Sequence, residues 1–206
     1  GTIAVLALEP ADTTDLDLLD AWRGGDARAG SLLFRRHFAA LSRFFRNKVD
    51  VGVEDLIQAT FLACVEGRDR FREASSFRTY LFAIARNLLY AYYRRQHRAV
   101  DFVQTSVVDL GASPSGPLGR REEAAALLRA LRAIPLEFQV VLELYFWEHL
   151  TAREMAEIQA VPEGTIRTRL RRAKQLLEQA LAQVARDPAE LRETLSNLDA
   201  WASSVR

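Results

Sequence analysis

Apolar residues recur along most of this chain at intervals of three or four positions, which is the spacing of one face of an α-helix. Helices are predicted in the first half over residues 15–49, with one interruption, and over 53–66 and 77–98. Ser75 or Ser76 is a suitable N-cap for the helix over 77–98. Because no segment shows the alternating pattern of a half-buried strand, the sequence predicts an all-α fold.

The helical pattern stops once in the middle of the chain. Residues 99–120 contain serine, glycine, Pro114 and Pro117 and have no sustained helical period, which is typical of a linker. A second helical block follows at 121–185. The pattern therefore predicts two small helical domains, 1–98 and 121–185, joined by a flexible linker.

A C-terminal helical extension is predicted over residues 186–206. Asp187 is a suitable N-cap, Pro188 fits the first turn of a helix, and Leu191 and Leu195 begin an apolar stripe. Two interpretations remain open. The helix packs on its own second domain, or it regulates the chain by contacting a partner or by masking a DNA-binding face.

Two short helical patterns meet at a tight turn within residues 150–175. Thr151 and Glu154 form a capping box at the start of the first, and Pro162 fits only the first turn of the second. Apolar residues continue every three or four positions from Ile166 onward. The opposite face carries short side chains first and arginines after them, as a DNA recognition helix does. That face and its flanks consist of Gly164, Thr165, Arg167, Thr168, Arg171, Arg172 and Gln175. The alternative is an amphipathic helix with an ordinary solvated face.

Composition narrows the class of protein. A single cysteine, Cys64, excludes an internal disulfide framework and suits a reducing cytosol. The three histidines lie too far apart to suggest a metal site, and no apolar run approaches the roughly 18 residues of a membrane helix. We therefore expect no cofactor, no metal and no membrane insertion.

The charge of the chain is nearly balanced in total, at +1, but it is segregated along the sequence. Residues 1–21 contain five acids and no base. Residues 75–98 contain five arginines and no acid, and residues 165–174 contain five basic residues and no acid. Such segments give local positive surfaces that nucleic-acid phosphates could neutralise.

Aromatic and basic side chains are interleaved between residues 71 and 98. Aromatic rings can stack on unpaired bases, and each such contact contributes about 1–3 kcal/mol. Phe77, Leu81 and Ile84 share an inward stripe, so several of the rings belong to the core instead. The segment nevertheless has the composition of a surface that captures an opened DNA strand.

Residues 54–98 closely resemble region 2 of the extracytoplasmic-function (ECF) group of bacterial RNA polymerase sigma factors. The resemblance rests on DLIQATF at 55–61, FR at 71–72 and FRTYLFAIARN at 77–87, followed by an arginine cluster. Residues 131–181 resemble region 4 of the same family. With LLDAWRGGDARAGSLLFRRH resembling region 2.1, the likeness extends over roughly residues 15–182.

The resemblance implies a non-catalytic subunit, located on the nucleoid in the cytoplasm, that binds core RNA polymerase and directs it to promoter DNA. It implies contacts with the clamp of the largest polymerase subunit and with the flap of the second largest. The residues implied in core binding are Asp55, Leu56, Gln58 and Phe61, of which Leu56 and Phe61 also suit the core. An anti-sigma protein, or inhibition by the C-terminal extension, is a further partner that the sequence leaves open.

The resemblance also assigns the promoter contacts. The −35 contacts are Thr165, Arg167, Thr168, Arg171 and Arg172. The −10 contacts are Phe71, Ser75, Ser76, Tyr80, Asn87, Arg94, Arg95 and Arg98. The chain departs from the family pattern at Ala59, where the family has glutamate, at Tyr80, where it has tryptophan, and at Glu163, which adds an acid to the recognition helix. His149 and Ala160 replace turn glycines, so left-handed backbone there would be strained.

Two other functions compete with this interpretation. A stand-alone helix-turn-helix regulator would bind duplex DNA without polymerase, but it leaves the segment from Asp55 to Arg98 unexplained. An enzyme acting on DNA would need a nucleophile cluster or metal-binding carboxylates, and the sequence shows no such constellation.

Overall fold

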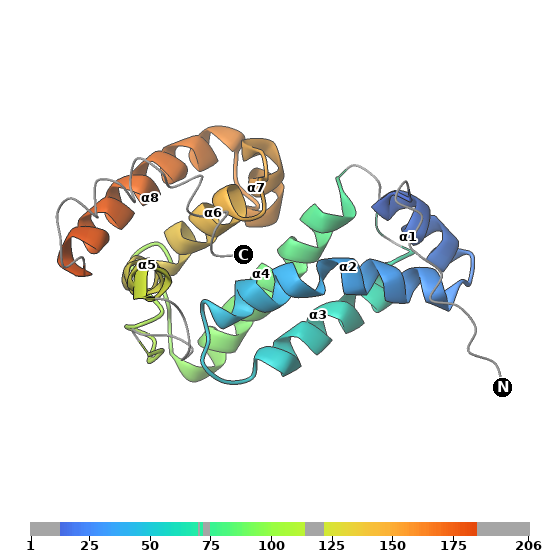
Figure 1. Ribbon diagram of the computed structural model, residues 1–206, viewed down its shortest axis with the longest axis horizontal. Helices are drawn as coiled ribbons and strands as arrows, with labels where there is room; N and C mark the ends of the chain where they lie inside the picture. The colour runs from blue at the N-terminus through green and yellow to red at the C-terminus, as the bar shows by residue number, and fades with distance from the viewer. Residues whose placement is uncertain (1–12, 70, 72–74, 114–121, 185–206) are drawn as a thin grey trace.

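The structure is a computed structural model, and it describes residues 13–69, 71, 75–113 and 122–184. In those residues the regular structure is helical apart from one isolated antiparallel bridge between Ser106 and Pro135 (Figure 1). The helices are α1 (Asp15–Arg23), α2 (Ala27–Arg46), α3 (Val53–Gly67), α4 (Phe77–Gln96), α5 (Glu122–Ala133), α6 (Leu136–Phe146), α7 (Ala152–Gln159) and α8 (Glu163–Val184). The all-α prediction is confirmed, whereas the predicted helix over 186–206 lies outside the described residues.

Helices α1, α2 and α4 each begin at a side chain that satisfies free backbone N–H groups. Thr14 caps α1 in a capping box with Asp17, and the Asp26 carboxylate caps α2. Of the two serines proposed for α4, Ser76 is the N-cap, and its hydroxyl accepts from the backbone N–H of Thr79.

Helices α1–α4 form the N-terminal lobe, in which α1 packs on α2, and α3 packs against both α2 and α4 (Figure 1). Its centre is filled by buried leucine and phenylalanine side chains, among them Leu33, Leu41, Phe45, Leu81, Phe82 and Leu89. Gly30 permits the close contact between α1 and α2, because a Cβ there would lie 2.7 Å from the indole of Trp22.

The first part of the predicted linker, residues 99–113, is packed rather than loose, and we call it the strap. Phe102, Val107 and Leu110 are buried in the core that α4 and α6 share. The backbone N–H of Leu136 donates to the Thr105 carbonyl at 2.9 Å, which fixes the strap to the start of α6. The strap is a series of turns, so it lacks a helical period, but its three apolar anchors hold it in place. The rest of the linker, including Pro114 and Pro117, lies outside the described residues.

Helices α5–α8 form the C-terminal lobe. The inner faces of α5, α6 and α8 enclose a second core that includes Leu131, Leu142, Phe146 and Leu177. The opposite side of α6 faces the N-terminal lobe, and α7 packs against α4. Because both of its sides are covered, α6 is buried nearly all round. None of the described helices is both long and apolar enough to cross a membrane.

Candidate nucleic-acid interface and protein-binding groove

The turn between α7 and α8 is built without glycine. Thr151 and Glu154 form the expected capping box at the start of α7. Ala160 ends α7 with φ 53° and ψ 46°, and its N–H donates to the carbonyls of Ala156 and Glu157. His149, before α7, has φ 51°. Both positions that lack the family's turn glycines therefore have left-handed backbone, and the Cβ of each residue carries a steric cost there.

Helix α8 turns its apolar stripe inward and several polar residues outward. Ile166, Ala173 and Leu177 are buried. Of the five residues implied in −35 contacts, four are exposed and Thr165 is half-buried; the exposed ones are Arg167, Thr168, Arg171 and Arg172. The periodicity therefore located the outward face of this helix.

Three of the basic side chains on α8 have protein partners. Arg167 donates to the Glu163 carboxylate at 2.5 Å, one turn earlier. Arg169 points inward and donates to Glu137 at 2.5 Å and to the Gln159 side-chain oxygen at 2.7 Å. The Lys174 ammonium lies 4.9 Å from the centre of the Tyr145 ring. Only part of the basic run between 165 and 174 is therefore directed outward.

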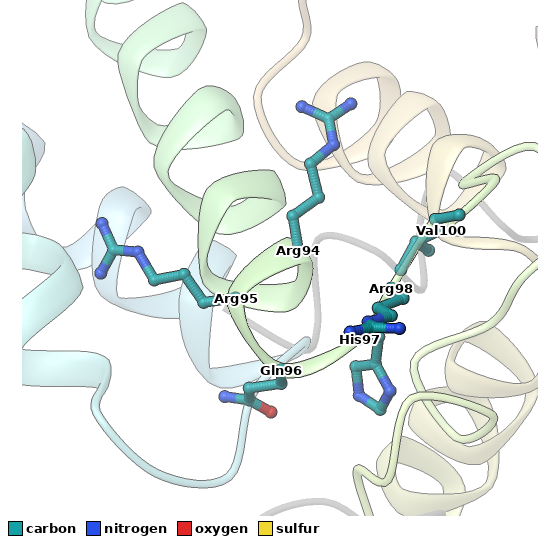
Figure 2. A pocket seen from close by; sticks show the side chains of 7 residues that line it. Arg94, Arg95, Gln96, His97, Arg98 and Val100 are labelled. Atoms are coloured by element: carbon teal, nitrogen blue, oxygen red, sulfur yellow. The ribbon is translucent and has the colours of Figure 1, made fainter.

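The last turn of α4 and the residues just after it carry an exposed group of arginines. Arg94, Arg95 and Arg98 border a hollow of about 400 Å³ with residues 96–97 and 99–100. Figure 2 shows the side chains of Arg94 and Arg95 diverging from the end of the helix. His97 is tied to the strap through its Nε2, which lies 3.1 Å from the Leu110 carbonyl. Asn87, in the middle of α4, is also exposed.

The other residues implied in −10 contacts lie around the start of α4. Tyr80 is half-buried, and its ring centre lies 4.7 Å from that of Phe71. Phe71 is itself 8% exposed, and its carbonyl accepts from Arg23 at 2.5 Å. The Phe71 ring therefore packs against the Tyr80 ring and is not presented to solvent. Ser75 is half-buried, and Ser76 is engaged as the N-cap.

A groove of about 550 Å³ lies between α2 and α3 on the N-terminal lobe. Gln58 and Phe61, two of the residues implied in core binding, line it together with Phe38, Leu62 and Val65. Asp55 is exposed but does not line the groove, and Leu56 is buried at 8% exposure. Only two of the four residues implied in core binding, Gln58 and Phe61, therefore line this groove.

Sequence reasoning missed the apolar residues that dominate this groove. Phe38, Leu62 and Val65 are 50%, 55% and 41% exposed. The signal was present, because apolar residues on α3 occupy more of the helix surface than one buried stripe requires. An exposed cluster of large apolar side chains of this kind marks an interaction surface.

Sequence reasoning also missed three buried glutamates on and after α6, namely Glu137, Glu143 and Glu148. Their contacts reach Arg43, Lys48, Arg78 and Arg86 of the N-terminal lobe. Two of the five arginines between residues 75 and 98, Arg78 and Arg86, are thereby held in ion pairs with the C-terminal lobe. An α6 sequence that is apolar on every side predicts a buried helix, and the charges within it predict buried partners. Within the described residues, no group of three or more histidines, cysteines or carboxylates is placed to hold a metal ion.

Comparison with known proteins places both lobes in one family. Residues 33–99 match the family model for Sigma-70 region 2, and residues 124–177 match that for Sigma-70, region 4. The ECF RNA polymerase sigma-E factor of Salmonella typhimurium is 27% identical over 177 residues, which is 80% of this chain and 93% of that protein. The RNA polymerase sigma factor HrpL of Pseudomonas syringae is 31% identical over 135 residues, 63% of this chain and 73% of HrpL.

Solved structures show the same fold. CnrH, in its complex with the cytosolic domain of CnrY, superposes with a TM-score of 0.64 at 22% identity, covering 83% of this chain and 99% of CnrH. The sigma factor RpoE of Bartonella quintana, in complex with the anti-sigma factor NepR, has a TM-score of 0.56 at 24% identity, covering 72% and 92%. Since both regions match in order and whole sigma factors align over most of the chain, it belongs to the ECF family of bacterial RNA polymerase sigma factors, which act in transcription initiation.

Proposed function

We propose that this sigma factor binds core RNA polymerase, directs it to a two-part promoter and helps to hold the opened DNA. The observation that carries the proposal is the outward face of α8, where Thr168, Arg171 and Arg172 are exposed on a helix that a buried stripe fixes in orientation. A second surface for nucleic acid and a groove for protein accompany it on the N-terminal lobe.

The −35 element is read by α8 in the major groove. An arginine can donate two parallel hydrogen bonds to a guanine edge, which contributes about 1–3 kcal/mol of discrimination against another base. Arg171 and Arg172 are the candidates for such contacts, and Thr168 is short enough to let the helix approach. Arg167 is held by Glu163 in the free protein, so its contact with DNA requires exchange of a carboxylate for a phosphate.

The −10 element is captured on α4 once its strands separate. Asn87 offers an exposed amide that can pair with a base edge, and Tyr80 offers a ring edge near the start of the helix. The exposed guanidinium groups of Arg94, Arg95 and Arg98 lie at the other end of the same helix, where they can follow the phosphates of the strand. Phe71 stabilises the position of Tyr80 from beneath.

The groove between α2 and α3 is the proposed site for the clamp of the largest polymerase subunit. Burial of its exposed apolar side chains by a partner helix would be favourable at about 25 cal/mol per Å² of apolar surface. Gln58, exposed at the rim of the groove, can provide a directional hydrogen bond. The C-terminal lobe is the proposed partner of the flap of the second-largest subunit.

A regulatory protein partner is also part of the proposal, because both solved relatives were captured with a protein bound, and NepR is an anti-sigma factor. The alternative source of inhibition is the extension over residues 186–206. Deleting residues 187–206 separates the two: higher transcription from the shortened chain supports self-inhibition, and unchanged transcription and stability contradict it.

Co-elution with core RNA polymerase tests the proposal against a stand-alone DNA-binding regulator. We expect a 1:1 complex with core in gel filtration and specific promoter binding only by that complex. If the chain does not bind core RNA polymerase but binds duplex DNA tightly on its own, the result would support the stand-alone regulator.

A further inference from the structure

The connection between α3 and α4 leads into part of the site proposed for the −10 element, and α1 lies beside the start of α4 (Figure 1). The structure describes residues 68, 69, 71, 75 and 76 of this connection. Phe71, within it, packs its ring on Tyr80 of α4 with the ring centres 4.7 Å apart. We call Phe71 and Tyr80 the ring pair. The contacts that fix the ring pair decide where an unpaired base can be received.

Arg23, the last residue of α1, holds the connection at two backbone carbonyls. Its Nε and Nη2 each donate to the Arg68 carbonyl at 3.1 Å, and Nη2 also donates to the Phe71 carbonyl at 2.5 Å. Its Nη1 donates to the Asp20 carboxylate at 3.2 Å. A guanidinium directs several donors in a fixed geometry, and a charged donor makes stronger hydrogen bonds than a neutral one. Helix α1 therefore fixes two points of the connection that lie three residues apart.

Capping of α3 explains only part of this contact. Arg68 is the C-cap of α3, and the last carbonyls of a helix lack partners within the helix. The Phe71 carbonyl lies beyond that end, so capping does not require its bond with Arg23. The Phe71 N–H in turn donates to the Gly67 carbonyl at 3.1 Å. Both polar groups of the Phe71 backbone are therefore fixed, one by α3 and the other by α1.

Helix α1 is itself anchored in the core of the N-terminal lobe. Trp22 is buried and meets the edge of the Phe34 ring at a centre-to-centre distance of 5.2 Å. The Arg68 guanidinium lies 5.3 Å from the Trp22 ring, which adds a second contact between α1 and the connection. The Arg23 side chain is 22% exposed, so most of its surface is occupied by the protein. Its position suits a support for the site, with no direct part in binding DNA.

Gly67, the last residue of α3, leaves the space that Tyr80 occupies. A Cβ at Gly67 would lie 2.1 Å from the Tyr80 hydroxyl oxygen, which is a clash, and 3.5 Å from the ring carbon Cζ, which is an ordinary contact. Glycine is less favourable than alanine within a helix, so this close contact gives a reason for glycine at the position. The end of α3 therefore accommodates the Tyr80 hydroxyl, as Arg23 holds the Phe71 backbone.

We propose that Arg23 and Gly67 are positioning residues for capture of the −10 element, and that they fix the ring pair before an unpaired base arrives. A site that is ordered in advance does not lose binding energy to the ordering of its own side chains. This inference rests on the proposed function, because it takes Phe71 and Tyr80 to belong to the −10 site. Arg23 and Gly67 act through the ring pair and do not contact DNA.

Hydrogen exchange at the Phe71 amide tests the role of Arg23 in the free, full-length chain. Arg23→Gln removes the charged fork, so we expect this amide to exchange at least about tenfold faster, while amides in the middle of α2 exchange as before. Arg28→Gln removes an exposed positive charge from the first turn of α2 and is the matched control, which should change neither rate. Unchanged exchange at Phe71 in a folded Arg23→Gln chain overturns the role of Arg23.

Binding of opened DNA by the holoenzyme tests the consequence for the −10 site. The probe is a fork DNA from a promoter whose start site has been mapped with this chain, duplex over the −35 element and single-stranded over the −10 element. Arg23→Gln should weaken binding of this fork about tenfold, while binding of core polymerase and of a duplex −35 fragment changes less than about twofold. A merely structural role would not single out the fork, so equal affinity for the fork in the variant and the unaltered holoenzyme contradicts the inference.

Gly67→Ala provides a test that does not involve Arg23. The added methyl group should displace the Tyr80 ring and weaken fork binding about tenfold. Tyr80→Phe removes the oxygen that the methyl group meets, so adding Gly67→Ala to Tyr80→Phe should cost less than about twofold. An equal loss in both backgrounds overturns the role of Gly67.

Failure of the proposed function has a different signature. If core polymerase with the unaltered chain gives no promoter-specific start sites, the proposed function is wrong, and with it the assignment of the ring pair to the −10 site. If start sites appear but Arg23→Gln and Gly67→Ala bind the fork as the unaltered chain does, the proposed function stands and the positioning role is wrong.

Discussion

Cys64 lies on the buried side of α3, where burial raises the pKa of its thiol to about 12. At pH 8 the reactive thiolate is therefore scarce, and we expect native Cys64 to react with a disulfide reagent at least about 100-fold more slowly than in the urea-unfolded chain. Stopped-flow labelling measures both rates on the only cysteine in the chain. Equal rates in the two states would contradict the burial of α3.

Ala160 holds the turn between α7 and α8 in a left-handed conformation that glycine adopts without steric cost. Ala160→Gly should raise the free energy of unfolding by about 0.5–1 kcal/mol, after allowance for the greater freedom of glycine in the unfolded chain. Urea denaturation measures the change. Ala39→Gly, at an exposed position in the middle of α2, is the matched control and should lower it by about 1 kcal/mol.

Individual side chains were predictable from the sequence where local periodicity decides their direction. Arg171 and Arg172 follow from the apolar stripe of α8. The contacts of Arg78, Arg86 and Arg169 with glutamates could not be predicted from periodicity, because those glutamates lie between 32 and 70 residues away. Contacts over such separations depend on how the helices pack, which periodicity does not specify.

The exposed groove between α2 and α3 gives the clearest prediction at the scale of elements. Leu62→Glu places a charge among the apolar side chains of the groove, so we expect affinity for core polymerase to fall at least tenfold, by about 1.4 kcal/mol or more. Because Leu62 is 55% exposed, the melting temperature should hardly change. Val103→Glu, at a 41% exposed position on the strap, is the control and should leave core binding unaltered.

Helix α1 is attached to α2 through Asp15, which lies 2.8 Å from Arg36 and 2.6 Å from His37. Burial alone would raise the pKa of Asp15, but the hydrogen bonds and charges of His37 and Arg36 outweigh it and hold the pKa below 3.8. The contribution of Asp15 to stability is therefore complete above its unfolded-state pKa and is lost as the pH falls through its lower native value.

Asp15→Asn should accordingly lower the free energy of unfolding by about 1 kcal/mol at pH 6. The difference from the unaltered chain should shrink as the pH falls through the lowered native pKa of Asp15, because the native carboxylate then becomes protonated and loses these contacts. Denaturation curves across this pH range measure it. Asp20→Asn on the same helix affects only an exposed pair with Arg23 and should change stability by less than about 0.5 kcal/mol. A constant deficit across the pH range would show that Asp15 acts through packing rather than charge.

Among the elements, the helices were predictable and the strap was not. Capping residues and apolar periods indicated helix starts at Ser75 or Ser76, of which Ser76 is the cap, and at Thr151. The strap contains no period, and its anchors Phe102, Val107 and Leu110 occur at spacings of five and three. These three residues can be recognised as anchors only when the surface between α4 and α6 that buries them is known.

At the scale of the whole molecule, two domains were predicted but their association was not. The near-balanced total charge gave no indication that glutamates on and after α6 pair with basic side chains of the N-terminal lobe. Cross-lobe pairing explains why a basic segment such as 75–98 contributes only part of its charge to the surface. Only the cations left outside this interface are available to a partner at the surface, and we expect promoter DNA to be that partner.

The central claim is that this chain makes core polymerase start transcription at specific promoters. The most direct test is transcription of a pool of genomic fragments by core polymerase with and without the chain, followed by mapping of the RNA 5′ ends. We predict start sites that appear only with the chain and share two upstream motifs about 25 base pairs apart, with Arg171→Ala weakening use of the upstream motif about tenfold. Transcripts whose start sites are identical with and without the chain would contradict the account.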